Sequence, residues 1–219
     1  MRVKPILFNT EMVRAILDGR KSCTRRLVKP QPDEKHTCLL GFVTDSTEKK
    51  EVGCFGFGID ECGGSIQYAK PLYQIGDILY VRETTWQKIG YYLDVDGETK
   101  PSWYNEFRYV ASDEEPEYGW NYCWAKRPSV HMPKEAARLF LSVTNVRVER
   151  LQDMTDDDAE AEGCFDYTST ALGFPNVWDS TIKKSDLDRY GWDANPYVWV
   201  IEFERCEKPE LLESEGQYD

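Results

Sequence analysis

The chain has 219 residues, of which 41% are hydrophobic and 13% aromatic, as expected of a globular protein rather than a disordered one. Its net charge of −12 argues against strong nonspecific binding to duplex DNA or long RNA, because such binding relies on widespread positive charge. No run of 18 apolar residues offers a membrane span, and Asn9 and Glu11 interrupt the apolar stretch that a signal peptide needs.

Seven cysteines, an odd number without evident pairing, favour free thiols and a cytoplasmic location. One metal site can be considered in the sequence, a zinc site built from His36, Cys38, Cys54 and Cys62. These residues contain no C-x-x-C pair, which makes zinc the weaker reading, and we expect neither a metal nor a cofactor.

Positive charge is concentrated at the start of the chain. Residues 1–30 carry eight Lys and Arg against two acids, a net charge of +6, so the remaining residues carry −18. We therefore expect a local basic patch on an acidic protein, which does not oppose a small pocket for one nucleoside.

The first predicted elements are a strand and a short helix. Val3 to Phe8 predicts a strand, and Pro5 favours an edge position. Asn9 or Thr10 can cap a helix that follows, and Gly19 can end it in the left-handed conformation. One apolar face is expected from the helical spacing of Met12, Val13, Ile16 and Leu17.

The middle of the chain predicts short strands and hairpins. Residues 25–28 favour a second strand, and residues 33–75 a long loop region or a pair of weak hairpins. Residues 78–81 are a short apolar run typical of a buried strand. The aromatic-rich residues 86–128 predict hairpins, with Asp96-Gly97 as one turn.

The last third predicts a helical turn from Pro133 to Ala137 and a long strand from Leu139 to Val148. Thr155 and Asp158 have capping-box spacing at the start of a second short helix, and Glu162 lies at its far end.

We expect residues 164–195 to be a surface excursion, residues 197–203 the last strand, and residues 207–219 a flexible acidic tail. Together the elements predict one α+β domain over residues 1–206, built on a small mixed β-barrel with short flanking helices. The expected insertions into this domain are residues 33–75, 87–130 and 164–195.

Four sequence blocks occur in one order along the chain: GRKSCT, GDILYVRE, DMTDDDAEAEG and NPYVWVIEF. In this order they resemble the ASCH family of PUA-like barrels, and the longer arrangement is similar to ASCH proteins of phages and prophages. The resemblance implies a PUA-like fold and a nucleoside or RNA partner, either a single modified base or a short single strand.

A compact ASCH member hydrolyses N(4)-acetylcytidine with a lysine, a threonine and a glutamate. The resemblance carries these roles to Lys21 and Thr24 in GRKSCT and to Glu162 in TDDDAEAE. The chain departs from the family pattern in having Ser22 for a threonine and in its long insertions. We expect the substrate-binding residues to be Arg20, Ser22, Arg26, Arg82 and Trp86.

The chemistry requires a nucleophile, a base and donors for the oxyanion. Thr24 supplies the hydroxyl, and Lys21 acts as its base when neutral. Glu162 orients the site or holds the exocyclic nitrogen of the substrate. Side chains 21 and 24 would face opposite sides of an extended strand, so the chain must turn between Lys21 and Thr24 for them to cooperate. Gly19, which ends the helix, leaves room for such a turn.

Two other functions remain open. The same barrel can act as a non-catalytic module that binds RNA or a modified base, or it can be a ribonuclease. The scarcity of histidine weighs against a ribonuclease, because acid–base RNA cleavage often uses that side chain and the chain has only His36 and His131. Arg82 likewise has two readings, a structural pair with Glu83 or a contact with a phosphate.

Overall fold

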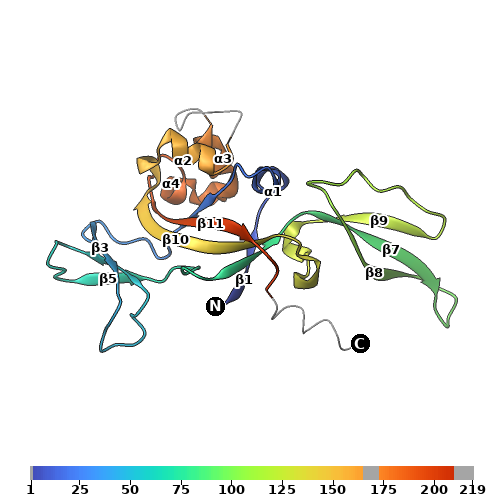
Figure 1. Ribbon diagram of the computed structural model, residues 1–219, viewed down its shortest axis with the longest axis horizontal. Helices are drawn as coiled ribbons and strands as arrows, with labels where there is room; N and C mark the ends of the chain where they lie inside the picture. The colour runs from blue at the N-terminus through green and yellow to red at the C-terminus, as the bar shows by residue number, and fades with distance from the viewer. Residues whose placement is uncertain (1, 165–172, 210–219) are drawn as a thin grey trace. The chain divides into compact units, whose positions relative to one another are not determined.

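The structure is a computed structural model, and it describes residues 2–164 and 173–209 (Figure 1). The chain forms two compact units. Unit 1 consists of Met1–Lys21, Asp77–Ser142 and Glu204–Asp219, and unit 2 of Ser22–Gly76 and Val143–Phe203. Each unit thus combines segments far apart in the sequence, and a single domain over residues 1–206 stays a prediction.

In unit 1 the strand order is β1-β6-β10, with β1 (Val3–Leu7), β6 (Ile78–Arg82) and the start of β10 (Phe140–Arg150). β1 runs parallel to β6 from the pair Val3↔Ile78, and β10 runs antiparallel to β6. β1 is an edge strand, which confirms the position expected from Pro5.

Helix α1 (Thr10–Leu17) begins as the sequence predicts, because the side chain of Asn9 accepts a hydrogen bond from the Met12 N–H at 2.8 Å. Gly19 ends it at φ +74°. The N–H groups of Arg20 and Lys21 then both donate to the Ala15 carbonyl, at 2.8 and 3.0 Å. The chain therefore turns directly after Gly19, before Lys21, and the turn expected between Lys21 and Thr24 stays a prediction. The buried residues of α1 are Val13, Ala15 and Ile16, whereas Met12 and Leu17 are only partly buried.

A three-stranded antiparallel sheet in unit 1 confirms the hairpins expected over residues 86–128. Its order is β8-β7-β9, with β7 (Thr85–Leu93), β8 (Thr99–Tyr109) and β9 (Tyr122–Arg127). The turn between β7 and β8 contains Gly97 at φ +77°. Two 3₁₀ turns follow, η1 (Ser129–His131) and η2 (Lys134–Ala136), and the second confirms the predicted helical turn.

Unit 2 contains the rest of β10 together with β11 (Tyr197–Cys206) and β2 (Cys23–Leu27), in the order β10-β11-β2. β11 pairs antiparallel with β2, with Ile201 opposite Thr24, and β2 is an edge strand. A separate sheet of β3 (Cys38–Phe42), β4 (Phe55–Gly58) and β5 (Ile66–Ala69) realises the pair of hairpins expected within residues 33–75.

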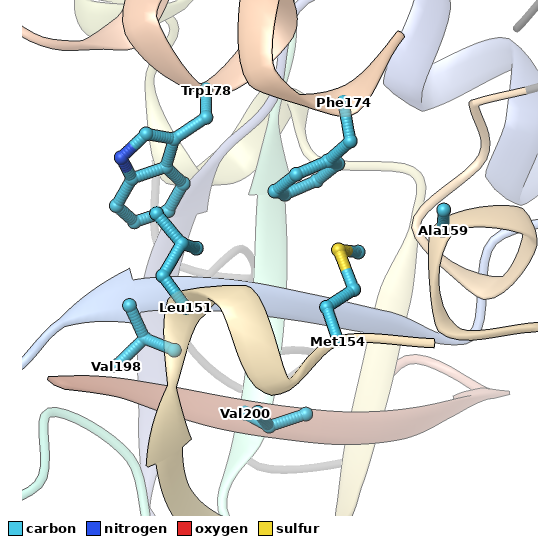
Figure 2. Packing of buried hydrophobic residues seen from close by; sticks show 7 residues of the cluster. All are labelled: Leu151, Met154, Ala159, Phe174, Trp178, Val198 and Val200. Carbon is cyan, nitrogen blue, oxygen red and sulfur yellow. The ribbon is translucent and has the colours of Figure 1, made fainter. Parts of the chain in front are cut away.

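The helices of unit 2 are short. They are η3 (Leu151–Asp153), α2 (Asp156–Ala161), α3 (Phe174–Thr181), η4 (Lys184–Asp186) and α4 (Leu187–Tyr190). In Figure 2, Phe174 and Trp178 point from α3 toward the core, where Val200 lies on β11. The cluster comprises Leu151, Met154, Ala159, Phe174, Trp178, Val198 and Val200.

The predicted surface excursion over residues 164–195 is wrong for its described part. Phe174 and Trp178 are both buried because their i, i+4 spacing places them on one face of α3. Residues 165–172 of this segment lie outside the described residues, as do residues 210–219 of the expected acidic tail.

The α+β class, with a small mixed sheet, short flanking helices and long insertions, is confirmed. Over the ranges 2–164 and 173–209, each sheet is open and has two edge strands rather than closing into a barrel. No helix in these ranges is long and apolar enough to cross a membrane.

Candidate functional site

Thr24 is wholly buried on edge strand β2, with an exposed fraction of 0%. Its Oγ1 accepts a hydrogen bond from Arg26 Nη1 at 2.9 Å, and the same nitrogen also donates to the Arg25 carbonyl at 2.9 Å. Thr24 and Arg26 lie two residues apart on a strand, so they share one face of the sheet. A guanidinium thus polarises the Thr24 hydroxyl, because a charged donor stabilises negative charge on the oxygen that accepts from it.

Glu162 and Tyr73 act electrostatically on this guanidinium. Burial lowers the pKa of Arg26 below the ordinary arginine value, although Glu162 and Tyr73 both oppose the shift. Burial raises the pKa of the Tyr73 phenol, and Arg26 works in the opposite direction. The neighbourhood of Thr24 therefore combines a hydroxyl, a guanidinium, a phenol and a carboxylate, all from unit 2.

Arg25 points to the opposite face of β2 and forms a buried ion-pair cluster. Its side chain is 0% exposed and contacts Glu149 at 2.6 Å, Asp158 at 3.4 Å and Glu162 at 3.6 Å. Burial alone would lower the pKa of Arg25, but attraction to Glu162 and Glu149 outweighs it and the pKa is raised. Arg25 is therefore a firmly charged cation whose burial depends on these carboxylates.

A second arginine extends the cluster. Arg147 on β10 pairs with Glu149 at 3.3 Å, with Asp158 at 3.2 Å and also with Glu202. Asp158 is held in turn by the predicted capping box, in which Thr155 and Asp158 exchange hydrogen bonds at the start of α2. The cluster thus joins β2, β10, β11 and α2 through charged side chains.

The end of α2 brings Glu162 to this cluster. Glu162 is the C-cap residue of α2 and is 4% exposed, and Gly163 follows it at φ +87°. The Ser22 N–H donates to the Ala161 carbonyl at 2.9 Å, which places the end of the helix beside the start of edge strand β2. From this position Glu162 interacts with both Arg25 and Arg26, although they face opposite sides of the strand.

Lys21 belongs to unit 1. It is 4% exposed, and its Nζ lies 5.3 Å from the centroid of the Phe8 ring. Of the three predicted catalytic residues, the structure thus brings Thr24 and Glu162 into one charged neighbourhood. The convergence of Lys21 with them stays a prediction.

The expected substrate-binding residues divide into two groups. The first group lies beside Lys21 in the sequence. Arg20 pairs with Asp18 at 2.9 Å, and Ser22 has an exposed side chain.

The second group, Arg82 and Trp86, lies in unit 1. Arg82 donates to the Met132 carbonyl at 2.9 Å and also to the Val130 carbonyl. Glu83, the structural partner expected for Arg82, pairs instead with Arg138 at 2.9 Å. Trp86 lies in β7 and is buried. The substrate roles of Arg82 and Trp86 stay predictions.

Sequence reasoning missed Arg25 as a member of the site, together with its partners Glu149 and Asp158. The position of Arg25 within strand β2 indicates that it needs such partners. Arg25 alternates with Leu27, which packs against the core of unit 2, and lies opposite the buried Val200. A cation in a core-facing register requires buried carboxylates.

The residues considered for zinc have other contacts. His36 Nδ1 lies 2.6 Å from Asp33 Oδ1 and its Nε2 lies 3.2 Å from Ser65 Oγ, and Cys54 Sγ donates to the Lys50 carbonyl. Within residues 2–164 and 173–209, no group of three or more His, Cys, Asp or Glu side chains is arranged to hold a metal ion.

A scan against protein-family models found no match to the chain, and a search of curated proteins found none either. A search of solved structures found similarity to the crystal structure of an ASCH domain from Lactobacillus crispatus JV V101, with 11% sequence identity and a TM-score of 0.43. The similarity covers 93% of this chain and 79% of the ASCH domain chain.

Proposed function

We propose that this protein hydrolyses N-acylated cytosine nucleosides, with Thr24 as the nucleophile. The observation that carries the proposal is the part-buried hydrogen bond from Arg26 Nη1 to Thr24 Oγ1, in a neighbourhood that also contains Glu162. A threonine hydroxyl becomes a useful nucleophile when a base removes its proton and a fixed cation stabilises the alkoxide. Arg26 supplies the cation, and Lys21, three residues earlier in the chain, supplies the base.

In the first half of the reaction the neutral Lys21 amine takes the proton from Thr24 Oγ1, and this oxygen attacks the acyl carbonyl carbon. The bond from that carbon to the exocyclic nitrogen breaks, and the nitrogen leaves with the proton returned from Lys21. In the second half, water attacks the acyl ester on Thr24, releases the carboxylic acid and restores the hydroxyl. No oxidant or metal enters this balance.

Glu162 holds the exocyclic nitrogen of the substrate in this scheme. Its carboxylate lies 3.6 Å from Arg25 Nη1, and Arg25 is anchored in turn by Glu149 at 2.6 Å. Arg25 is therefore a positioning residue, which acts on the substrate only through Glu162. Removing it should disturb both Glu162 and the fold of unit 2.

A nucleoside suits this site better than a long nucleic acid. Much of the positive charge in the first thirty residues is paired within the chain, as Arg14 with Glu11 at 2.7 Å and Arg20 with Asp18 at 2.9 Å. Little of this charge is left to follow a phosphate backbone, whose binding depends on releasing many counterions.

The test is release of acetate from N(4)-acetylcytidine by the purified protein. Lys21→Ala should abolish turnover, whereas Lys29→Ala, which removes an exposed lysine just beyond the other end of β2, should leave it unchanged. Glu162→Gln should raise KM or lower kcat while keeping similar volume in the cluster.

Two outcomes would contradict the proposal in different ways. Tight binding of cytidine derivatives without acetate release would mean that the protein is a non-catalytic module that binds a modified base. Full turnover in Lys21→Ala would show that the protein hydrolyses the substrate without Lys21 as the base.

A further inference from the structure

A pocket of about 430 Å³ lies on one face of the β8-β7-β9 sheet in unit 1. Lys88 of β7 lies directly opposite Trp124 of β9, and Gly90 lies opposite Tyr122, so Lys88 and these two rings share a face of the sheet. Glu106 of β8 contributes to the same pocket wall. The volume is that of a small-molecule site, and the wall combines rings with charge.

This wall already binds one primary ammonium, which is the chain's own. The Lys88 Nζ lies 4.4 Å from the centroid of the Tyr122 ring and 6.0 Å from that of Trp124, and it pairs with Glu106 at 2.8 Å. The hydrogen bond to Glu106 raises the pKa of Lys88 above its ordinary value. Rings and a carboxylate at these distances are the groups that recognise an organic ammonium.

Another part of the lining carries more negative charge than the two cations of the pocket neutralise. It is formed by the segment Asp113–Glu117, with sequence DEEPE. Three carboxylates of this segment, Glu114, Glu115 and Glu117, are exposed, and throughout the described ranges none of the three forms an ion pair. Five carboxylates in total line the pocket against two cations, Lys88 and Arg108.

We propose that this pocket binds a linear polyamine, a small flexible molecule with several ammonium groups along one chain. One ammonium takes the place of the partly exposed Lys88 Nζ beside the Tyr122 and Trp124 rings, and the others meet the carboxylates of Asp113–Glu117. The net lining charge of −3 disfavours a nucleic acid or another anion. The proposal is independent of the hydrolase, because every residue that it uses lies in unit 1.

The test is isothermal titration of the full chain with spermidine at low salt. We expect one molecule bound per chain and an affinity that falls as salt rises, because exposed charges are screened. The triple variant Glu114→Gln, Glu115→Gln, Glu117→Gln should bind about tenfold more weakly. A control triple variant with the same change in net charge, Glu34→Gln, Glu61→Gln, Glu98→Gln, replaces exposed acids outside the pocket lining and should bind as the wild type does.

Three results would overturn the polyamine assignment. They are equal loss of affinity in the two triple variants, tighter binding of a lysine-rich peptide than of spermidine, and complete displacement of spermidine by an equal concentration of Mg²⁺. Circular dichroism of each variant checks the fold, and the three substituted residues are exposed, so the sheet should remain intact. Acetate release is unaffected by any of these outcomes, which keeps the two proposals separable.

Discussion

Arg25 in unit 2 and Lys88 in unit 1 are both strand cations surrounded by acids, yet their surroundings differ. The Arg25 side chain is 0% exposed and contacts three carboxylates, those of Glu149, Asp158 and Glu162. The Lys88 side chain is 23% exposed, pairs with one carboxylate and lies near aromatic rings.

The difference follows from how much water each cation retains. A fully buried charge pays a large desolvation penalty, so it persists only where several opposite charges are fixed around it. A cation near solvent keeps part of its hydration, and rings can supply the rest of its stabilisation. Glu149 and Asp158 are therefore committed to the fold, whereas Glu114, Glu115 and Glu117 in the pocket lining beside Lys88 remain available to a ligand.

Removing Arg25 should produce the largest loss of stability. Arg25→Ala leaves Glu149 and Glu162 buried without their main cation, which should lower the free energy of unfolding by about 3–5 kcal/mol. Urea unfolding followed by circular dichroism measures this loss. Arg20→Ala, which breaks only the surface pair with Asp18, is the matched control and should change little. Equal effects of the two substitutions would mean that the cluster does not hold unit 2 together.

Arg26 is the neighbour of Arg25 on β2, and it is the one that contacts the proposed nucleophile directly. Because Arg26 donates to Thr24 Oγ1, Arg26→Ala should lower kcat for acetylcytidine hydrolysis about 100-fold or more, as loss of an oxyanion donor does. Arg26→Lys retains the charge and should recover part of the rate. Steady-state kinetics of both variants provide the measurement, and unchanged kcat in Arg26→Ala would leave Arg26 with no part in the chemistry.

The ion-paired carboxylate of Asp158 should also make the stability of the protein sensitive to low pH. Burial raises the pKa of Asp158, but hydrogen bonds from Thr155 and attraction to Arg25 outweigh it, so the folded-state pKa lies below the ordinary value. The stability from this shift is present above the unfolded-state pKa of about 3.9 and is lost as pH falls through the lower folded-state pKa.

Asp158→Asn should therefore lower the melting temperature near neutral pH and reduce its fall toward pH 2, which thermal unfolding across pH can measure. Asp188→Asn, an exposed aspartate of α4, serves as the control. Parallel melting curves for wild type and Asp158→Asn would show that this carboxylate contributes no linked stability.

Lys88 should give the smallest effect on stability. Lys88→Gln removes a partly exposed ammonium with one carboxylate partner, so its effect should be less than about a quarter of that of Arg25→Ala in the same urea titration. A loss as large as that of Arg25→Ala would contradict the difference between the two regions.

Local signals predicted the parts of the site that depend on neighbouring residues. The Asn9 cap and Gly19 define α1 and the turn after it, and the Thr155–Asp158 capping box starts the helix that ends at Glu162. Each motif satisfies backbone groups within a few residues, so its outcome can be read from spacing. The resemblance to the ASCH family pointed to Lys21, Thr24 and Glu162, and their joint catalytic role stays a prediction.

The rest depends on contacts between residues far apart in sequence. Arg25 pairs with Glu149 across 124 residues, and local spacing does not reveal that partner. The same holds for α3, where Phe174 and Trp178 lie in a segment whose Gly, Ser and Thr content suggested a surface loop. In both cases the burial of the side chains depends on tertiary packing, which composition does not reveal.

Acetate release by Thr24→Val and Thr24→Ser beside the wild type tests directly whether Thr24 is the nucleophile. Valine keeps the volume of the buried threonine without its hydroxyl, and serine keeps the hydroxyl. We expect no turnover in Thr24→Val, partial turnover in Thr24→Ser and full turnover in Thr144→Ala, the exposed control on β10. Undiminished acetate release by a folded Thr24→Val would show that Thr24 is not the nucleophile.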